Sequence, residues 1–410
     1  MTQKYALCVD IGTTSLKAAL IDAEGNVGAF SQQFFSNPDS KMAACCWLPA
    51  LRNATRELTA QTEHTICAIC ISGNGPTIVS DDGTTLLWNA PISDAVNNSY
   101  KNLLKDMRSL FIPRITAFRT LFPSQWNKSR FIYSGPEYLI YTLTKASLTI
   151  LPEIRYLDTY WSNKELEIAA LEKEKLPPYA TIAHTAGFTT PDITAQLGLA
   201  QQVPVFCGGP DFIAAMIGTN SLSVGTIYDR AGSSEGVNLC APFPLQKSTI
   251  RNLPSVVAGL WNAAVLQSES GRMFMNYKKI AEAVAKRTIS YKEIVTYSIA
   301  NKSSDGFAIL EAILHNLKVS IDTLASAAHE SNIDIQMPIV ITGGQVKNDE
   351  WLQMRCNYIG LPFAVCTCAD AELLGNAAVS FYGLGVYSSL KDAATKIVKY
   401  KKIYEPGKNP

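Results

Sequence analysis

The sequence predicts a mixed α/β protein built from two related halves, and three observations support this fold class. Short apolar runs rich in β-branched residues alternate with longer segments that have helical spacing. The order strand, glycine- and hydroxyl-rich turn, strand occurs near the start of each half, at 6–21 and again at 223–239. The length of 410 residues is enough for two domains. We therefore expect domains at 1–204 and 205–410, with a short crossing between them.

The elements of the first half follow from these patterns in order. Strands are predicted where apolar runs end in turn residues, and helices where apolar residues recur every three or four positions. The segment 163–175 is charged and amphipathic, and two prolines follow it at 177 and 178. We expect strands at 6–12, 16–22, 66–73 and 76–83, and helices around 53–58, 135–145, 163–175 and 191–202.

The second half restarts the pattern. The run 203–218 reads as a strand, a Gly-Gly-Pro turn and a helix that begins near Asp211. The segment 338–360 reads as a buried strand, a Gly-Gly turn and a helix, and 372–385 as a helix rich in small residues.

Composition narrows the classes of function. Apolar residues make up 47% of the chain and charged residues 17%, and the formal net charge is +1. Without a basic run or a nucleic-acid-binding motif, we expect no nucleic-acid partner. No apolar stretch is long enough to cross a bilayer, and the chain enters a strand almost at once, so we expect neither a membrane partner nor a signal peptide.

The ten cysteines do not suggest a disulfide framework. Cys67 and Cys70 have the CxxC spacing, but within a strand a separation of three places the two thiols on opposite faces, which is poor geometry for one metal ion. We expect reduced thiols and a cytoplasmic location.

Three turns could bind phosphate, because each places backbone N–H groups and hydroxyls after an apolar strand. Each turn alone is ordinary turn chemistry. Together, spread over both halves, they suit a nucleotide held between two domains, although no P-loop is present. The turn residues are Gly12, Thr13, Thr14 and Ser15, then Gly232, Ser233 and Ser234, then Gly343, Gly344 and Gln345.

Two carboxylates could carry chemistry. Asp10 ends the first strand beside the first turn, where it could reach Mg²⁺ through water or bond the N–H groups of its own turn. Asp211 follows Gly-Gly-Pro, where it could cap the helix or accept a proton from a substrate hydroxyl. The segment from Gly271 to Met275 could close over an adenosine or simply begin a helix. The histidines show no catalytic pattern, and neither GxSxG nor HExxH occurs.

In order and spacing, these motifs resemble a carbohydrate kinase of the FGGY family, in the actin-like ATPase superfamily. The resemblance covers nearly the whole chain and rests on "DIGTTSLKAALID", "ICAICISG", "DDGTTLLWNAPISD", "PEYLIYTLTK", "VPVFCGGPDFIAAMIG", "AGSS", "ITGGQVKNDEWLQ" and "ELLGNAAVSFYGLG". It implies two RNase H-like domains with ATP and sugar in an interdomain cleft, the N-terminal one binding sugar and the C-terminal one nucleotide. It also implies transfer of the γ-phosphate of ATP to a hydroxyl of a sugar, polyol or sugar acid.

Carried over by position, the resemblance makes Asp211 the general base and assigns Asp10, together with Asp211, to Mg²⁺. It implies substrate contacts at Asn74, Asp94, Asp211 and Phe212. It implies nucleotide contacts at Thr13, Thr14, Ser15, Lys17, Gly232, Ser233, Ser234, Gly271, Gly344, Gln345 and Asn348.

The chain departs from the family pattern at several of these positions. Ser233 replaces the usual Thr, and the charged pair Asp229-Arg230 precedes the second turn. The sugar-side motif reads Gly73-Asn74-Gly75, without the usual Gln. Of the family's Trp-x-Asp-x-Arg, only Asp94 remains. The identity of the sugar therefore does not transfer, and a homodimer is left open. A non-catalytic nucleotide or sugar sensor is the second interpretation, and an actin-like or chaperone-like ATPase with a protein partner is the third.

Overall fold

The computed structural model describes residues 3–60, 65–92, 109–232 and 234–407. The chain forms two compact units. Unit 1 consists of Met1–Ala214 and Glu372–Ile397, and unit 2 of Ala215–Ala371 and Val398–Pro410. The predicted boundary at 204 coincides with the first residue of a strand of unit 1.

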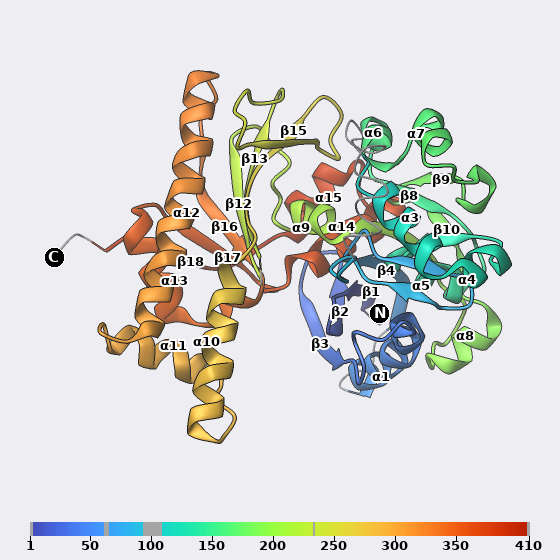
Figure 1. The fold of residues 1–410 in the computed structure, drawn as a ribbon, viewed down its shortest axis with the longest axis horizontal. Coiled ribbons are helices and arrows are strands. Elements are labelled where there is room, and N and C mark those ends of the chain that lie inside the picture. Colours follow the sequence, from blue (N-terminus) through green and yellow to red (C-terminus); the bar gives the residue numbers. More distant parts are fainter. Residues whose placement is uncertain (1–2, 61–64, 93–108, 233, 408–410) are drawn as a thin grey trace. The chain divides into compact units, whose positions relative to one another are not determined.

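Unit 1 is built on a six-stranded sheet in the order β10-β11-β4-β1-β2-β3 (Figure 1). The strands β1, β4 and β11 are parallel, whereas β2, β3 and β10 are antiparallel to their neighbours. Every residue of β1 after Lys4 is buried, so both faces of the sheet are covered. The strands span Lys4–Ile11 (β1), Ser15–Asp22 (β2), Val27–Phe34 (β3), Thr65–Gly73 (β4), Thr185–Phe188 (β10) and Pro204–Pro210 (β11).

Helices and short strands complete unit 1. One face of the sheet packs side chains such as Leu7, Val9 and Ile71 against Leu51 and Leu139 of two helices, α1 and α5. The helices are α1 (Trp47–Ala60), α3 (Ile112–Leu121), α4 (Pro123–Lys128), α5 (Gly135–Thr144), α6 (Leu157–Tyr160), α7 (Asn163–Ile168), α8 (Pro191–Gln196), α14 (Ala371–Gly383) and α15 (Leu390–Ile397). Two small sheets contain β5 (Ile78–Ser80), β6 (Thr85–Leu86), β7 (Ile132–Ser134), β8 (Thr149–Leu151) and β9 (Tyr179–Thr181).

Unit 2 contains a seven-stranded sheet in the order β14-β15-β13-β12-β16-β17-β18. Its long helix α12 lies against this sheet (Figure 1). Leu317, Ile321 and Leu324 of α12 belong to the core formed with the sheet. The strands are β12 (Thr226–Ala231), β13 (Glu235–Ala241), β14 (Arg251–Pro254), β15 (Trp261–Gln267), β16 (Gln336–Thr342), β17 (Phe363–Cys366) and β18 (Tyr400–Tyr404). The helices are α9 (Asp211–Gly218), which crosses the division between the units, α10 (Ser270–Ala285), α11 (Tyr291–Ala300), α12 (Asp305–Glu330) and α13 (Asp349–Ile359).

The two sheets repeat one topology, which confirms the predicted pair of related halves. In unit 1, β3-β2-β1 form an antiparallel meander and β4 and β11 then add in parallel. In unit 2, β15-β13-β12 form the same meander and β16 and β17 add in parallel. An antiparallel strand follows at the end of each series, β10 in one and β18 in the other.

Three predicted elements are wrong in detail. The helix predicted over 191–202 ends at Gln196. The helix predicted over 163–175 ends at Ile168, and Ala170 adopts a positive φ of 50°. Arg119 donates to two backbone carbonyls after the helix, and Leu171 is buried, so tertiary contacts override the local helical pattern. The Gly-Gly-Pro segment is the last part of strand β11, with Gly209 at a φ of 91°.

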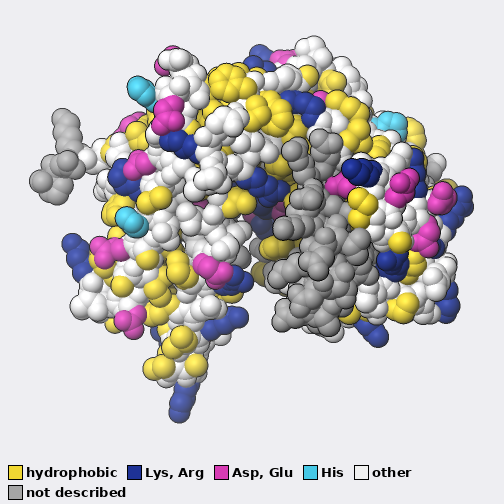
Figure 2. Space-filling view, turned by 45° about the horizontal axis from the view of Figure 1, so that its top comes forward, with side chains coloured by type: hydrophobic (Ala, Val, Ile, Leu, Met, Phe, Trp, Pro, Cys, Tyr) yellow, Lys and Arg dark blue, Asp and Glu magenta, His cyan; other side chains and the backbone are white. Residues whose placement is uncertain are grey.

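The ten cysteines are free thiols, as predicted. Within the described part of the chain, no helix has the length and apolar character that crossing a membrane requires. Lys and Arg side chains are interspersed with Asp and Glu on the face drawn in Figure 2, in keeping with the small net charge.

Candidate active site

The first group of predicted residues lies at the carboxyl ends of the parallel strands of unit 1. Asp10 on β1 is in register with Ser72 on β4, and Ser72 with Gly209 on β11. Asp211 begins α9 directly after β11. Side chains at the carboxyl ends of neighbouring parallel strands share one edge of the sheet, which is where α/β proteins commonly bind ligands.

A buried chain of hydrogen bonds holds Asp10 in place. The Nδ2 atom of Asn376, on α14, donates to the Ser72 hydroxyl at 2.9 Å and to the Val9 carbonyl at 2.8 Å. The Ser72 hydroxyl in turn donates to Oδ1 of Asp10 at 2.9 Å. Ser72 and Asn376 have no exposed surface, and Asp10 is 6% exposed. The Asp10 carboxylate is therefore fixed from behind.

Neighbouring charges make Asp10 electrostatically unusual. Burial, with the carboxylates of Glu372 and Asp211, raises the pKa of Asp10 to about 7, although Lys17 and the bond from Ser72 act in the opposite direction. Glu372, in the first turn of α14, is itself buried. The structure thus brings three of the predicted residues, Asp10, Lys17 and Asp211, near one another. We call Asp10, Asp211 and Glu372 the carboxylate cluster.

Small residues allow α14 to approach this edge of the sheet. A Cβ atom on Gly375 would lie 2.0 Å from the carbonyl oxygen of Ala214. A Cβ atom on Gly208 would lie 2.5 Å from the Ile71 carbonyl and 2.6 Å from Oδ1 of Asn376. Any larger side chain at either glycine would push α14, and with it Glu372 and Asn376, away from Asp10.

The first predicted phosphate turn adjoins a predicted substrate residue. The Gly12 N–H donates to the Ser15 carbonyl at 2.9 Å and closes the turn. The Thr13 hydroxyl accepts from Nδ2 of Asn74 at 2.9 Å and from Nε1 of Trp88 at 3.1 Å. The turn is therefore held against the end of β4.

The remaining predicted residues of unit 1 differ in exposure. Thr14 is exposed, whereas Ser15 is buried and its hydroxyl accepts from Gln32 at 3.0 Å. The Phe212 ring lies 6.4 Å from that of Tyr156. Asp94 lies outside the described residues.

A small pocket opens beside this site in unit 1. It contains a buried acid, Glu137 on α5, whose carboxylate accepts from the backbone N–H groups of Ser134 at 2.8 Å and Ile150 at 2.6 Å. Burial raises the pKa of Glu137 to about 7, although these two hydrogen bonds act in the opposite direction. The pocket is lined by Gly73, Gly75, Phe111, Ser134, Pro136, Glu137, Ile150, Tyr160, Gly209 and Pro210.

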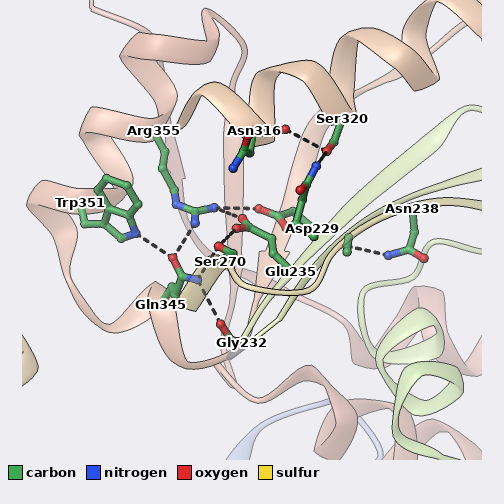
Figure 3. A network of polar contacts seen from close by, with 12 residues as sticks. Asp229, Gly232, Glu235, Asn238, Ser270, Asn316, Ser320, Gln345, Trp351 and Arg355 are labelled. Atoms are coloured by element: carbon green, nitrogen blue, oxygen red, sulfur yellow. Dashed lines mark hydrogen bonds and ion pairs between the residues drawn. The ribbon is translucent and has the colours of Figure 1, made fainter. Parts of the chain in front are cut away.

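In unit 2, one side chain joins the three segments that the resemblance assigns to nucleotide (Figure 3). Nε2 of Gln345 donates to the Gly232 carbonyl of the second turn at 3.2 Å. It also lies 3.5 Å from the hydroxyl of Ser270, the first residue of α10 and the neighbour of Gly271. Gly232, the start of α10 and Gln345 of the third turn therefore meet.

A buried ion network lies directly behind these turns. Nη1 of Arg355, on α13, donates to Asp229 at 2.9 Å and to Glu235 at 2.7 Å. Burial alone would lower the pKa of Arg355, but Glu235 and Asp229 raise it above its usual value. Burial, together with Glu235, raises the pKa of Asp229. We call Asp229, Glu235 and Arg355 the arginine cluster.

The other predicted residues of unit 2 have local roles in the structure. Gly343 has a φ of 101°, and a Cβ atom there would lie 2.6 Å from the Ala231 carbonyl, so only glycine fits. Oδ1 of Asn348 accepts from the backbone of Trp351 at 2.9 Å and caps α13. Gly344 and Ser234 are exposed. Ser233 lies outside the described residues.

Sequence reasoning did not select Ser72, Glu137, Glu372, Asn376 or Arg355. A signal was present for three of them, because Glu372 and Asn376 interrupt an apolar helix rich in small residues and Arg355 interrupts the apolar face of another. A buried polar residue requires a partner. The sequence does not say which partner, since Arg355 and Asp229 are 126 positions apart.

Comparisons with known proteins indicate which family the chain resembles. Residues 273–384 match the C-terminal domain of the FGGY family of carbohydrate kinases. The chain is 23% identical to a xylulose kinase of Staphylococcus epidermidis, with 99% of this chain and 93% of the relative aligned. It is 22% identical to an autoinducer-2 kinase of Escherichia coli, over 98% and 90% of the two chains.

The fold has close counterparts among solved structures. A ligand-bound xylulose kinase from Lactobacillus acidophilus superposes with a TM-score of 0.78 at 16% identity, covering 98% of this chain and 94% of that one. This likeness confirms the predicted α/β fold class. Residues 273–384 thus match the FGGY family of carbohydrate kinases, and nearly the whole chain is similar to proteins named as kinases.

Proposed function

We propose that this protein is an ATP-dependent carbohydrate kinase, which transfers the γ-phosphate of ATP to a hydroxyl of a sugar, polyol or sugar acid. The observation that carries the proposal is the carboxylate cluster, in which Asp10 and Asp211 lie close enough for one to raise the pKa of the other. The two residues are about 200 positions apart in sequence. The relatives reported above bear the names of kinases that act on small molecules.

Asp211 is the general base of the proposed reaction. Its carboxylate accepts the proton of the substrate hydroxyl as that oxygen bonds to the γ-phosphorus and the bond to the ADP oxygen breaks. Asp211 is the first residue of α9 and directly follows strand β11. A weak base suffices, since phosphoryl transfer has a loose transition state and depends mainly on orientation.

Asp10, with Asp211, is the proposed carboxylate partner of Mg²⁺. Among the described residues, no group of three or more His, Cys, Asp or Glu side chains is arranged to hold a metal. Mg²⁺ in phosphoryl-transfer sites is nevertheless bound by one or two carboxylates together with substrate phosphates. The chemistry of Asp10 fits such an ion, because its pKa is raised by burial and by neighbouring carboxylates that a cation would offset. When bound, Mg²⁺ would neutralise charge that develops on the phosphates.

The acceptor binds, in this proposal, near the pocket of unit 1. Asn74 and Phe212 contact the substrate, as does Asp94. Phe111 and Tyr160 give the pocket aromatic walls, and Glu137 holds its backbone at Ser134 and Ile150. Aromatic walls combined with a few fixed polar groups are typical of small-molecule sites.

The nucleotide contacts are proposed for each unit separately. In unit 1 they are Gly12, Thr13, Thr14, Ser15 and Lys17. In unit 2 they are Gly232, Ser233, Ser234, Gly271, Gly343, Gly344 and Asn348. The cytoplasmic location and a homodimer remain predictions; light scattering on the purified chain tests the latter.

The test is ADP release by the purified full-length chain with Mg²⁺ and ATP across a panel of ketoses, polyols and sugar acids. Strong stimulation by one acceptor, with the phosphorylated product seen by mass spectrometry, is the expected result. Nucleotide binding with no turnover on any acceptor would favour the sensor instead. Stimulation only by a protein would favour an ATPase with a protein partner.

A further inference from the structure

The amide of Gln345 is held at both ends by the protein. Its Oε1 atom accepts from Nη2 of Arg355 at 2.6 Å and from Nε1 of Trp351 at 3.2 Å. Since two donors point at Oε1, the orientation of the amide is fixed. Nε2 therefore points at the Gly232 carbonyl and the Ser270 hydroxyl (Figure 3).

Arg355 supports Gln345 from a fully buried position. Its guanidinium lies 4.9 Å from the centre of the Trp351 ring. Through Nη1 it holds Asp229 on β12 and Glu235 on β13, the two strands joined by the turn at 232–234. Glu235 also accepts from the Ser270 hydroxyl at the start of α10. One guanidinium is thus bonded to the base of the turn and to the side chain that reaches the turn itself.

We propose that Gln345 and Arg355 are positioning residues for the nucleotide, which set its affinity by holding Gly232 against the start of α10. The inference rests on the proposed function and assigns Gln345 a supporting role in place of the direct nucleotide contact implied by the family resemblance. The physical reason is preorganisation. A turn already fixed in its binding geometry loses less conformational freedom when the ligand arrives.

Two substitutions at Gln345 distinguish the contribution of its donor, Nε2, from that of its acceptor, Oε1. Gln345→Leu removes both the donor and the acceptor. Gln345→Glu keeps an acceptor for Arg355 and Trp351 but removes the donor to Gly232. If the hydrogen bond from Nε2 of Gln345 positions Gly232, both variants raise the Kd for ADP about tenfold, which corresponds to the free energy of about one hydrogen bond. Arg355→Lys keeps the charge but not the two-armed geometry, and we expect a smaller rise.

Gln353→Leu is the matched control. Gln353 is also half-buried and lies on α13, where its amide donates to Asn357 and to the Glu405 carbonyl, remote from the turns. The measurements are the Kd for ADP by isothermal titration calorimetry and the urea midpoint without nucleotide, all on the full chain. A merely structural role would lower the midpoint and leave the Kd for ADP unchanged.

The outcomes distinguish this inference from the proposed function. If wild-type protein binds ADP and both Gln345 variants weaken binding about tenfold while Gln353→Leu does not, the positioning role is supported. Equal affinity in wild type, control and both variants would overturn the positioning role alone. Failure of the wild-type chain to bind either ADP or ATP would overturn the proposed function, and this inference with it.

Discussion

The carboxylate cluster of unit 1 and the arginine cluster of unit 2 are both buried and both gather side chains that are remote in sequence. They differ in charge balance. In the arginine cluster, Arg355 donates to both carboxylates. In the carboxylate cluster, Glu372 and Asp211 both raise the pKa of Asp10, and Lys17 only partly opposes them.

This difference indicates that the arginine cluster supports the structure, whereas the carboxylate cluster is a candidate functional site. Buried ions are costly unless they are paired, and the arginine cluster contains its own cation. The carboxylate cluster keeps an excess of negative charge at the edge of a sheet, where α/β proteins bind ligands. A carboxylate whose pKa is as strongly perturbed as that of Asp10 is a candidate for function in such a place. We therefore expect changes in the carboxylate cluster to affect catalysis, and changes in the arginine cluster to affect stability and nucleotide affinity.

The largest expected effect comes from Asp211→Asn. Loss of the general base should lower acceptor-dependent ADP release about 1,000-fold while the melting temperature stays close to that of wild type. Asp192→Asn is the matched control, because Asp192 is an exposed acid in the first turn of α8. Turnover near the wild-type rate in Asp211→Asn would contradict the general-base role of Asp211.

Arg355→Met tests whether the arginine cluster stabilises the folded chain. It leaves Asp229 and Glu235 buried without their cation, which should lower the free energy of unfolding by about 3–5 kcal/mol in urea titrations. Adding Asp229→Asn and Glu235→Gln should restore part of that loss, because no unpaired charge then remains. Arg287→Met, which breaks an exposed pair with Glu293, should change little. A loss that the triple variant does not reduce would contradict the charge explanation.

Asp10→Asn should change how stability depends on pH. The pKa of Asp10 is about 7 in the folded chain, against an ordinary value of 3.8. Between these values the folded chain keeps a proton that the unfolded chain has released. The stabilisation is therefore complete below about pH 4 and is lost as the pH rises through 7. The uncharged asparagine does not suffer this loss.

The measurement is urea unfolding of wild type and Asp10→Asn at pH 4 and pH 8 without Mg²⁺. When the pH rises from 4 to 8, the free energy of unfolding of wild type should fall relative to that of Asp10→Asn by up to about 4 kcal/mol. In the same proteins, Mg²⁺ with ADP should raise the melting temperature of wild type more than that of the variant. A pH-independent difference would mean that folding does not raise the pKa of Asp10.

The smallest expected effect is that of Ser72→Ala. It removes the hydrogen bond that lowers the pKa of Asp10 and leaves the Asn376 amide short of an acceptor, so stability should fall by about 1–2 kcal/mol. The pKa of Asp10 should rise further, which would move the pH dependence of stability upward. Ser298→Ala, at a fully buried serine bonded within α11, should lower stability without that shift. An identical pH dependence in both serine variants would contradict the proposed chain from Ser72 to Asp10.

Much of the fold follows from the sequence by itself. The apolar runs with turn residues predicted both hairpins, β1–β2 and β12–β13, and the parallel strands β4, β11 and β16. These patterns are local, since the period of apolar residues and the chemistry of glycine turns depend on neighbours along the chain. The repeat of strand, hydroxyl turn and strand also indicated two related halves.

Only the tertiary structure decided what surrounds the predicted residues. Asp10 and Asp211 could be selected from sequence, but the sequence could not show that Ser72, Glu372 and Asn376 would surround Asp10. Asp229 stood out as a charged residue before the second turn, yet its partner Arg355 is 126 positions away. The helix predicted over 163–175 stops early because Arg119, remote in sequence, bonds the carbonyls that follow it. The physical reason is common to all three cases: burial, pKa and hydrogen bonding are set by atoms of elements that are remote in sequence and meet only when the chain packs, and no local period encodes that meeting.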